Sequence, residues 1–378
     1  MPELYIGLMS GTSLDGVDGV LADFAGGRMR VVCHASAPFT AELKAELLAL
    51  NTPGDNELHR AALAANALVR VYGVVVSVLL RTANFKPANV TAIGAHGQTV
   101  RHRPQEFDAR PDQGLAGGYT LQLNNPALLA ELTGIDVVAE FRTRDVAAGG
   151  QGAPLVPAFH REVFGTPGQA LAVLNIGGIS NLSLLAADAT TPLLGFDCGP
   201  GNALMDHWCQ RHTGQPFDKD GAWAAQGQVH QALLASLLAD AYLAKAPPKS
   251  TGRDLFNPTW LADRLAPFGA LAPVDVQASL TAFTARACAD DVLRYGKASA
   301  ALIVCGGGAL NTTLMRALQA QLPGLAVRSS AGHGLPPLEV EAAAFAWLAR
   351  QLALRRPGNL ASVTGARGER VLGALYPA

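Results

Sequence analysis

Three glycine-rich turns, each directly after a short apolar run, constrain the fold of this chain more than any other feature. They lie at residues 11–18, 177–181 and 306–308 of 378. Short apolar runs that end in glycine turns are typical of β-strands that lead into hairpins or helices. Glycine also lets backbone N–H groups approach phosphate oxygens without a Cβ in the way. Each turn alone could be an ordinary tight turn, but three at strand ends favour a nucleotide site.

The apolar runs around these turns predict two related α/β lobes, because the same order of elements occurs twice. The first half is expected to hold strands at 4–9, 17–24, 29–37, 90–96 and 136–139, helices at 41–50, 57–82 and 125–133, and a loop at 101–118. The second half is expected to hold strands at 170–176, 182–185 and 300–305 and helices at 203–211, 229–243, 278–295 and 312–321. We place the N-terminal lobe at 1–130, joined by 355–378, and the C-terminal lobe at 131–354.

Length and charge favour an enzyme that acts on a small molecule. A chain of 378 residues, 49% of them hydrophobic, is too long for one core and sufficient for two. The formal net charge is −1, so neither a nucleic-acid partner nor an anionic membrane is expected. The apolar stretch 61–80 is interrupted by Arg70 and predicts a buried helix instead of a membrane span.

Cysteine content and the start of the chain predict a cytoplasmic protein. The five cysteines are odd in number and none has C-x-x-C spacing, which argues against a disulfide framework or a zinc ribbon. The first apolar strand begins within three residues, without a basic region or cleavage site before it, so no secretory signal is expected. His207 and His212 are five residues apart without a third ligand nearby, so no zinc site is expected there.

The glycine turns do not match the common nucleotide motifs. The chain contains neither a G-x-x-x-x-G-K-[ST] loop nor a dinucleotide fingerprint with its downstream acidic residue. What remains is an architecture in which hairpin turns from two lobes hold the phosphates. It resembles, at the level of the fold, the two-lobed actin-like ATPases and sugar kinases, with ribonuclease H-like lobes and a central nucleotide cleft. The residues that we expect to bind ATP are Gly11, Thr12, Ser13, Leu14, Asp15, Gly16, Val17, Asp18, Gly177, Gly178, Ser180, Asn181, Gly306, Gly307 and Gly308.

Three aspartates can supply the metal ligand and the proton acceptor that phosphoryl transfer requires. Asp15 and Asp18 lie in the first turn and could hold Mg²⁺ through water. Asp197 lies between glycines in GFDCGPGN at a predicted strand end, where a stiff backbone would hold an accessible carboxylate. It could instead cap the following helix, but Asn202 lies nearer to the helix start. We therefore predict that Asp197 is the catalytic base.

Other polar residues have both a substrate-binding and a structural interpretation. His96, Gln98 and Thr99 in GAHGQTV could bind sugar hydroxyls or brace their own loop. Arg142, Arg144 and Asp145 could meet an anionic substrate group or form an internal ion pair.

Two basic residues follow a proline-rich turn. Lys249 and Arg253 in PPKSTGRDLFNP could contact phosphate or lie in a solvated loop.

Nine motifs, in order over residues 4 to about 354, resemble the anhydro-N-acetylmuramic acid kinase family. They are GLMSGTSLDGVDGVL, GAHGQTVRHRP, AAGGQGAPLVPAFH, LNIGGISNLS, GFDCGPGN, DKDGAWAAQG, PPKSTGRDLFNP, CGGGALN and VEAAAFAWLA. The resemblance implies an enzyme of cell-wall recycling that uses ATP and water to open 1,6-anhydro-N-acetylmuramic acid and phosphorylate O6. Its products would be N-acetylmuramate 6-phosphate and ADP, and a homodimer would be expected.

The same resemblance implies roles for individual residues. The turn from Gly11 to Asp18 would bind ATP, and Asp197 would be the general base for a water that attacks C1. Glu341 lies on a helix whose first turn could reach the sugar, although an acidic residue at a helix start is also favoured by the dipole. The chain departs from the family at Asn124-Asn125, where the family often has Gly-Asp, and at Glu140, where it usually has Asp. Both departures lie on the expected sugar side.

Two other functions use the same fold class. A non-enzymatic, ATP-gated interaction module of the actin or chaperone type would need a partner-binding lobe, but the two lobes account for the length of this chain. A metal hydrolase would need a histidine pair at metal-binding spacing, and we find none in the sequence.

Overall fold

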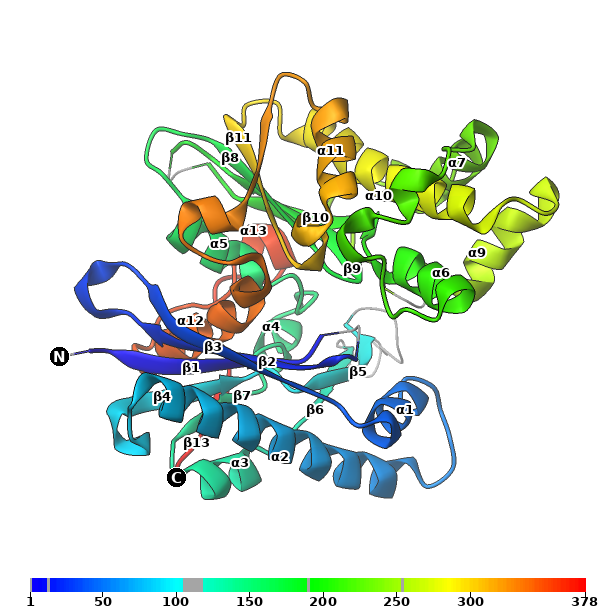
Figure 1. Ribbon diagram of the computed structural model, residues 1–378. Coiled ribbons are helices and arrows are strands. Elements are labelled where there is room, and N and C mark those ends of the chain that lie inside the picture. Colours follow the sequence, from blue (N-terminus) through cyan, green and yellow to red (C-terminus); the bar gives the residue numbers. More distant parts are fainter. Residues whose placement is uncertain (1, 12–13, 105–117, 189–190, 253–254) are drawn as a thin grey trace, which may run out of the picture. The chain divides into compact units, whose positions relative to one another are not determined.

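Apolar runs and short turns form a six-stranded and a five-stranded β-sheet and a separate two-stranded one. Most of their strands are labelled in Figure 1. The structure is a computed structural model that describes residues 2–11, 14–104, 118–188, 191–252 and 255–378. The chain forms two compact units. Unit 1 comprises Met1–Val163 and Leu338–Ala378, and unit 2 comprises Phe164–Pro337.

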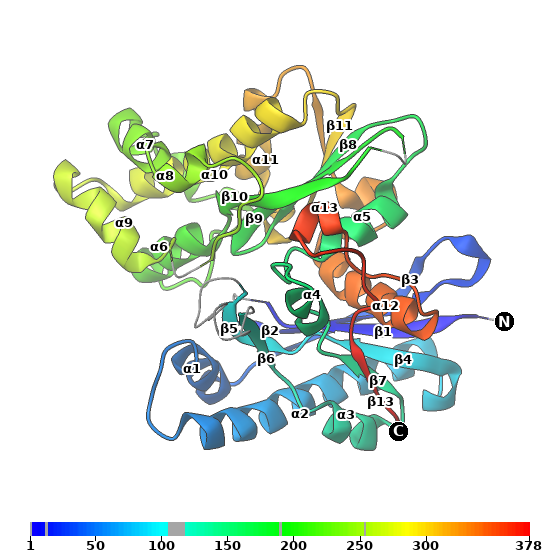
Figure 2. The same ribbon diagram turned by 180° about the vertical axis from the view of Figure 1, so that it is seen from behind.

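The sheet of unit 1 has six strands in the order β13-β7-β4-β1-β2-β3. These strands are β1 (Leu4–Met9), β2 (Gly16–Asp23), β3 (Arg30–Pro38), β4 (Val90–Ala95), β7 (Val137–Ala139) and β13 (Ala374–Tyr376). The first three strands form the predicted antiparallel meander, and β4 and β7 continue the sheet in parallel. Near the C-terminus, β13 pairs antiparallel with β7 at the sheet edge (Figure 2).

Helices cover both faces of this sheet. The helices of unit 1 are α1 (Ala41–Ala49), α2 (Glu57–Ala83), α3 (Pro126–Thr133), α4 (Thr143–Ala147), α5 (Val156–Phe164), α12 (Val340–Ala353) and α13 (Ala361–Thr364). A Cβ at Gly19 of β2 would meet Val75 and Leu79 of α2, whereas a Cβ at Gly7 of β1 would meet the backbone of α12. Gly7 lies opposite Val20, not Gly19, so α2 and α12 lie on opposite faces.

The sheet of unit 2 repeats the order with five strands, β10-β9-β8-β11-β12. These strands are β8 (Leu171–Ile176), β9 (Ile179–Leu185), β10 (Leu194–Pro200), β11 (Ala301–Cys305) and β12 (Ala326–Ser329). Again the first three strands form an antiparallel meander, and the last two extend the sheet in parallel from its first strand. This repeat confirms the predicted fold class, which is the two-lobed α/β architecture of actin-like ATPases and sugar kinases.

The helices of unit 2 are organised around one long buried helix. They are α6 (Ala203–Thr213), α7 (Gln231–Leu238), α8 (Ala241–Ala244), α9 (Pro258–Leu265), α10 (Pro273–Tyr295) and α11 (Thr312–Gln321). Helix α10 contacts β9, β10, α6, α7 and α11, and most of its residues are buried. The single helix expected at 229–243 is two helices, because Asp240 ends the first and caps the second by accepting a hydrogen bond from Tyr242 N–H.

The boundaries between the two units lie at different positions in the chain from those predicted. We expected a boundary near residue 130, but β7 adds to the sheet of unit 1 and α3 packs against α2. We also assigned the helix now seen as α12 to the second lobe, but it packs on β1 and β4 of unit 1. The first three residues of the expected loop at 101–118 belong to strand β5 (Gln98–Arg103), which pairs antiparallel with β6 (Tyr119–Leu123). Residues 105–117 of that loop lie outside the described residues.

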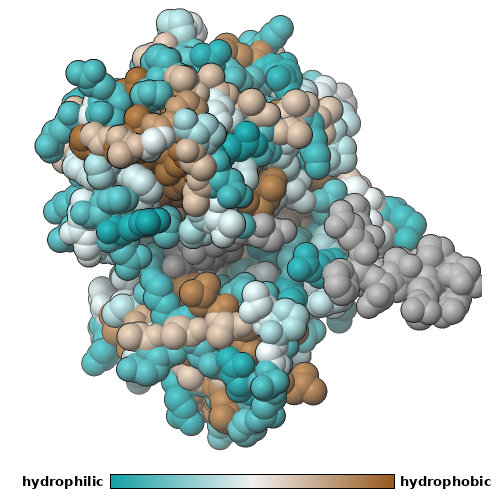
Figure 3. Space-filling model, turned by 90° about the vertical axis from the view of Figure 1, so that its right-hand side faces the viewer, coloured by the Kyte–Doolittle hydropathy of each residue, from teal (hydrophilic) through white to brown (hydrophobic). Residues whose placement is uncertain are grey.

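Helix α2 is long and apolar enough to cross a membrane, and half of its most apolar window is buried within the structure. Leu68, Tyr72, Val76 and Leu79 on this helix have almost no exposed surface. The pattern is that of a core helix, as the sequence predicted. Figure 3 shows one face of the molecule, on which apolar side chains are interspersed with polar ones.

Gly7→Ala is expected to lower the stability of unit 1 by about 3 kcal/mol, because overpacking at a rigid contact forces the backbone apart. A Cβ at Gly7 would lie 1.8 Å from the Ala342 carbonyl oxygen and 2.6 Å from the Ala346 nitrogen, so α12 would have to move. Scanning calorimetry would measure the fall in Tm. The matched control is Gly324→Ala, whose Cβ would have no atom within 4 Å. An unchanged Tm for Gly7→Ala would show that α12 accommodates the methyl group.

Candidate active site

The first glycine turn joins β1 to β2 and is anchored by Leu14. This leucine is buried, has a left-handed backbone (φ 57°), and its N–H donates to the Gly11 carbonyl at 3.2 Å. It packs in a cluster with Leu43 and Leu47, which fixes the turn against α1. Thr12 and Ser13, both predicted to bind ATP, lie outside the described residues.

The other predicted residues of this turn divide into exposed carboxylates and strand positions. Asp15 is 71% exposed, and its Oδ1 lies 3.0 Å from the Lys44 ammonium. Val17 has a buried side chain. A Cβ at Gly16 would lie 2.3 Å from the Ala37 carbonyl oxygen, so this glycine is needed for the pairing of β2 with β3.

Asp18 accepts a hydrogen bond from His34, with Oδ1 3.2 Å from Nε2. This bond is the main cause that raises the pKa of His34, while burial opposes it. Asp18 therefore has a cationic partner when His34 is protonated.

Asp18→Asn is expected to lower the pKa of His34 towards its ordinary value, as an NMR titration of the imidazole would show. Because the folded-state pKa of His34 is raised, its protonation stabilises the protein below the ordinary histidine pKa, and that stabilisation is lost as pH rises through the raised value. The stability difference between wild type and variant should therefore shrink above about pH 6.5. Asp23→Asn, at the other end of β2, is the control and should leave the titration of His34 unchanged. An unshifted His34 in Asp18→Asn would contradict the pairing.

The end of β4 brings His96 and Gln98 beside this turn, because β4 runs parallel to β1. His96 is buried, and its Nε2 accepts a hydrogen bond from Arg142 Nε at 3.0 Å. Burial, and secondly the Arg142 charge, hold the pKa of His96 well below its usual range, so the ring is neutral. Gln98 Nε2 donates to the Gly11 carbonyl at 3.3 Å. The Gln98 amide oxygen is buried and accepts no hydrogen bond from the described residues.

Thr99 also contacts protein. Its hydroxyl oxygen accepts a hydrogen bond from Gln122 Nε2 at 3.2 Å, across the β5–β6 pair. Arg142 donates to the Gly152 carbonyl at 2.8 Å as well as to His96. The predicted loop-bracing contacts therefore exist at these positions.

Asp145 has a structural role in place of the predicted substrate contact. Its side chain is 0% exposed and accepts hydrogen bonds from Gly152 N–H (2.7 Å), Asn359 Nδ2 (2.6 Å) and Thr364 Oγ (2.7 Å). The carboxylate therefore joins α4 to the segment that follows α4, to the residue Asn359 that precedes α13, and to α13 itself. A substrate would have to displace this network to reach it.

The predicted departures from the family also have local structural roles. Asn125 caps α3 by accepting a hydrogen bond from Leu128 N–H at 3.0 Å, a role that aspartate fills equally well. Asn124 donates to the Ala95 carbonyl at 3.2 Å. Glu140, in a left-handed conformation, accepts a hydrogen bond from the Tyr376 hydroxyl at 3.3 Å. These contacts give Asn125 and Glu140 roles that need no sugar, whereas the Asn124 amide oxygen is buried and accepts no hydrogen bond from the described residues.

In unit 2, the second and third glycine turns lie at the same sheet edge, because β8 and β11 are parallel neighbours. The Gly177 carbonyl accepts from Asn202 N–H at 2.7 Å, so this turn packs against the start of α6. Gly306 has φ 76° and donates to the Pro337 carbonyl, and Gly307 is exposed. Gly178 accepts from Gly201 N–H. A Cβ at Gly308 would lie 2.4 Å from Ile176 Cγ2, so this glycine is needed for the turn to pack.

Ser180 is buried, and its hydroxyl donates to the Pro200 carbonyl at 3.3 Å. It therefore braces the turn and has no surface that could face a phosphate.

Asp197 lies near this edge of the sheet, on β10, and is half-buried. The β9–β10 pairing shifts register between Asp197 and Gly199, and such bulges re-aim side chains. Asp197 Oδ2 accepts a hydrogen bond from Thr251 N–H at 2.9 Å. The residue that begins α6 is Asn202, whose side chain donates to the Ile176 carbonyl. The alternative that Asp197 caps this helix is therefore excluded.

Two buried oxygen atoms near Asp197 have no hydrogen-bond partner among the described residues. Asn181 lies directly opposite Asp197 in the β9–β10 pair, so their side chains share a face. Asn181 Oδ1 and Thr251 Oγ1 are buried and form no hydrogen bond with the described residues. Buried polar groups without protein partners point to water or a ligand. Thr251 was not among the residues predicted from the sequence, although it lies in one of the family-like motifs, PPKSTGRDLFNP.

Three further charged residues, Glu341, Lys249 and Arg253, were considered as possible ligand contacts. Glu341 lies in the first turn of α12 and is half-buried, which fits the dipole interpretation and leaves the substrate role a prediction. Lys249 is neither a phosphate contact nor part of a solvated loop, because it forms a buried ion pair with Asp291. Arg253 lies outside the described residues. The described parts of the chain contain no group of three His, Cys, Asp or Glu side chains that could hold a metal ion.

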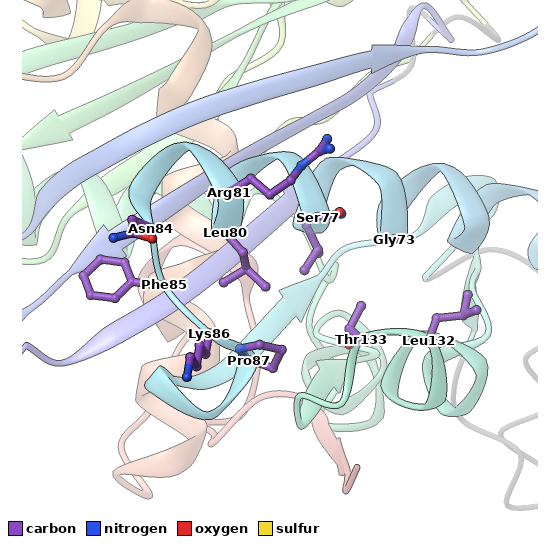
Figure 4. A pocket seen from close by; sticks show the side chains of 11 residues that line it. Gly73, Ser77, Leu80, Arg81, Asn84, Phe85, Lys86, Pro87, Leu132 and Thr133 are labelled. Carbon is purple, nitrogen blue, oxygen red and sulfur yellow. The ribbon is translucent and has the colours of Figure 1, made fainter.

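A pocket of about 490 Å³ lies on unit 1 between the C-terminal half of α2 and α3 (Figure 4). Ser77, Arg81, Phe85 and Leu132 are among its lining residues. None of the residues predicted to bind ATP, Mg²⁺ or sugar lines it. The pocket is therefore separate from the glycine turns.

The whole chain is similar to one family of kinases. Residues 3–378 match the family model for anhydro-N-acetylmuramic acid kinase. A relative of that name from Variovorax paradoxus (strain S110) is 70% identical over 379 residues, which cover 100% of this chain and 99% of the relative. Another, from Albidiferax ferrireducens, is 63% identical, and the match covers 100% of both chains.

Among solved structures, the activator of the 2-hydroxyisocaproyl-CoA dehydratase from Clostridium difficile with bound ADPNP is similar over 91% of this chain and 92% of its own, with 11% identity and a TM-score of 0.47. The match to the family model and the identity with full-length relatives decide the assignment. This chain belongs to the anhydro-N-acetylmuramic acid kinase family.

Proposed function

We propose that this protein uses ATP and water to open the anhydro bridge of 1,6-anhydro-N-acetylmuramic acid and to phosphorylate O6. The observation that carries the proposal is the match to this kinase family over residues 3–378, with a relative 70% identical over 99% of its length. The products would be N-acetylmuramate 6-phosphate and ADP, and the pathway would be the recycling of cell-wall sugars.

In this proposal Asp197 is the general base. Water attacks C1 of the sugar and gives its proton to the Asp197 carboxylate, while the bond between C1 and O6 breaks. O6 then bonds to the γ-phosphorus, and ADP leaves. The Thr251 N–H group, 2.9 Å from Oδ2, would hold the carboxylate in position. The unpartnered oxygens of Asn181 and Thr251 support a polar ligand beside Asp197.

The nucleotide would be bound by the glycine turns. We assign ATP contacts to the turn from Gly11 to Asp18 in unit 1 and to the turns at 177–181 and 306–308 in unit 2. Exposed glycine backbone, as at Gly307, allows phosphate oxygens to approach N–H groups. Ser180 and Val17 would support these turns from within, because both are buried.

Mg²⁺ would neutralise charge on the phosphate oxygens. Mg²⁺ in kinases is usually held by one or two carboxylates together with phosphates and water, so a complete protein cage is not required. Asp15 fits this role because it and its Lys44 partner are largely exposed and their pairing is easily exchanged. Asp18 fits less directly, since its carboxylate bonds to His34.

The sugar would contact groups of unit 1 after β4. The Gln98 amide oxygen could accept a hydrogen bond from a sugar hydroxyl, and neutral His96 would hold Arg142 for an anionic group. Thr99 and Glu341 remain predicted contacts. A homodimer and a cytoplasmic location also remain predictions, which light scattering and cell fractionation would test.

The test is the reaction in ¹⁸O-labelled water, followed by mass spectrometry of the sugar product. Label at the anomeric oxygen and none in the transferred phosphoryl group is expected, because water attacks C1 and O6 takes the phosphate. Unlabelled sugar, or label in the phosphoryl group, would contradict the mechanism. ATP turnover that is the same with and without the sugar would favour the interaction-module alternative.

A further inference from the structure

Asp197 is held from the open edge of its sheet by one short segment, residues 242–251. Strand β10 is the outermost strand of the unit 2 sheet, so its outer backbone groups need partners from elsewhere. Asp197 N–H donates to the Lys249 carbonyl at 3.2 Å, and Thr251 N–H donates to Asp197 Oδ2 at 2.9 Å. The Tyr242 hydroxyl donates to the Asp197 carbonyl at 2.8 Å. The position of the Asp197 carboxylate therefore depends on the position of this segment.

The segment is itself fastened to α10 by a buried ion pair. Lys249 Nζ lies 2.9 Å from Asp291 Oδ2, and the two side chains are 1% and 4% exposed. The same ammonium lies 5.4 Å from the ring centroids of Phe196 and Tyr242. The Lys249 ammonium thus contacts helix α10, the ring of Phe196 next to Asp197, and the ring of Tyr242, whose hydroxyl donates to the Asp197 carbonyl.

Stability alone is a weak reason to bury this pair. Removing two charges from water is costly, and well-packed apolar residues often serve a core at least as well. Burial raises the pKa of Asp291, against the opposing effect of Lys249, which reflects that cost. The pair does supply a defined geometry, because its charge-assisted hydrogen bond fixes the position of the Lys249 segment relative to α10.

We propose that Lys249 and Asp291 are positioning residues, whose ion pair sets the geometry of the Asp197 carboxylate through the backbone of residues 249–251. This inference rests on the proposed role of Asp197 as the base. According to this proposal, Lys249 of the PPKSTG motif positions Asp197 and does not bind phosphate. Helix α10 contributes to the same positioning through Asp291, in addition to its packing in the core.

The test compares two double variants. Lys249→Met/Asp291→Leu removes both buried charges and keeps apolar volume, so it should fold with a Tm near that of wild type. Its kcat is expected to fall roughly 10- to 100-fold with little change in KM for ATP, because small misplacements of a reacting group are costly. The control is Arg286→Gln/Asp290→Asn, an exposed pair on the same helix, which should keep wild-type kcat.

Hydrogen exchange supplies a readout that does not depend on activity. In Lys249→Met/Asp291→Leu, the amides of Asp197 and Thr251 should lose protection while those of β8 and β11 keep it. Retained protection at both amides would overturn the proposal, whatever happens to kcat. Lost protection with wild-type kcat would also overturn it, since geometry would then not matter.

A milder variant covers the case in which the double variant does not fold. Asp291→Glu keeps both charges and lengthens the acceptor side chain by one methylene, so protection and kcat should fall less than in the double variant. Unchanged protection and kcat in this variant would overturn the proposal. Asp197→Asn separates the two claims: if it too retains kcat, the role of Asp197 as the base has failed, and the hydrogen-exchange result still reports whether the ion pair positions it.

Discussion

Asp197→Asn is expected to lower kcat about 1,000-fold, because general base catalysis typically contributes between 10² and 10⁴. The asparagine keeps an oxygen that can accept the hydrogen bond from Thr251 N–H, so the local fold should survive. It cannot take a proton from water at neutral pH. The loss should therefore fall on the chemical step, and the Kd for ATP, measured by calorimetry, should change little.

Asp263→Asn is the matched control for this prediction. Asp263 is an exposed residue of α9 in the same unit, so its replacement should leave kcat and Kd unchanged. The assignment of Asp197 would be refuted by an Asp197→Asn enzyme with near-normal kcat. A variant that binds ATP much more weakly would instead indicate a role in the nucleotide site.

Local patterns made much of the fold predictable. The meander at 4–37 and the strands at 171–185 follow from short apolar runs between turns, and their boundaries agree with the sequence within a few residues. The placement of Asp197 close to a glycine-rich turn was also predictable, although its strand continues through Pro200 and does not end beside Asp197 as expected.

Contacts between distant segments were not predictable. Nothing local in α12 indicates that it packs on β1, because the requirement lies in Gly7 and Gly94, where α12 comes closest. The β5–β6 pair was missed because its two strands flank a loop rich in proline and glycine. Lys249 looked solvated since lysine usually is, and only its distance from Asp291, 42 positions further along the chain, shows otherwise.

The role of Asp145 shows the same limit at a candidate site residue. Its partners are Gly152, Asn359 and Thr364, two of which lie more than 200 positions away. A carboxylate beside two arginines in the sequence suggested a substrate site or an ion pair. The structure instead uses the carboxylate to gather three donors from separate segments of unit 1.

Asp145→Ala is expected to destabilise unit 1 by roughly 3–5 kcal/mol, because it removes the acceptor that three buried donors share. In a unit of this size the loss should lower Tm by about 10 °C, measurable by calorimetry. Asp136→Ala is the control, since its carboxylate accepts a hydrogen bond from the exposed N–H group of Ala378 at the end of the chain, and its Tm should hardly move.

A double-mutant cycle with Thr364→Val gives the stricter test of this network. Thr364→Val alone removes one donor to Asp145 and should cost about 1 kcal/mol. In the Asp145→Ala background the same change should cost less, because the hydroxyl has already lost its acceptor Asp145 and retains the 3.4 Å hydrogen bond to the Leu360 carbonyl. Additive costs would mean that the two side chains act independently, and a wild-type Tm with reduced kcat in Asp145→Ala would restore the substrate role that the sequence suggested.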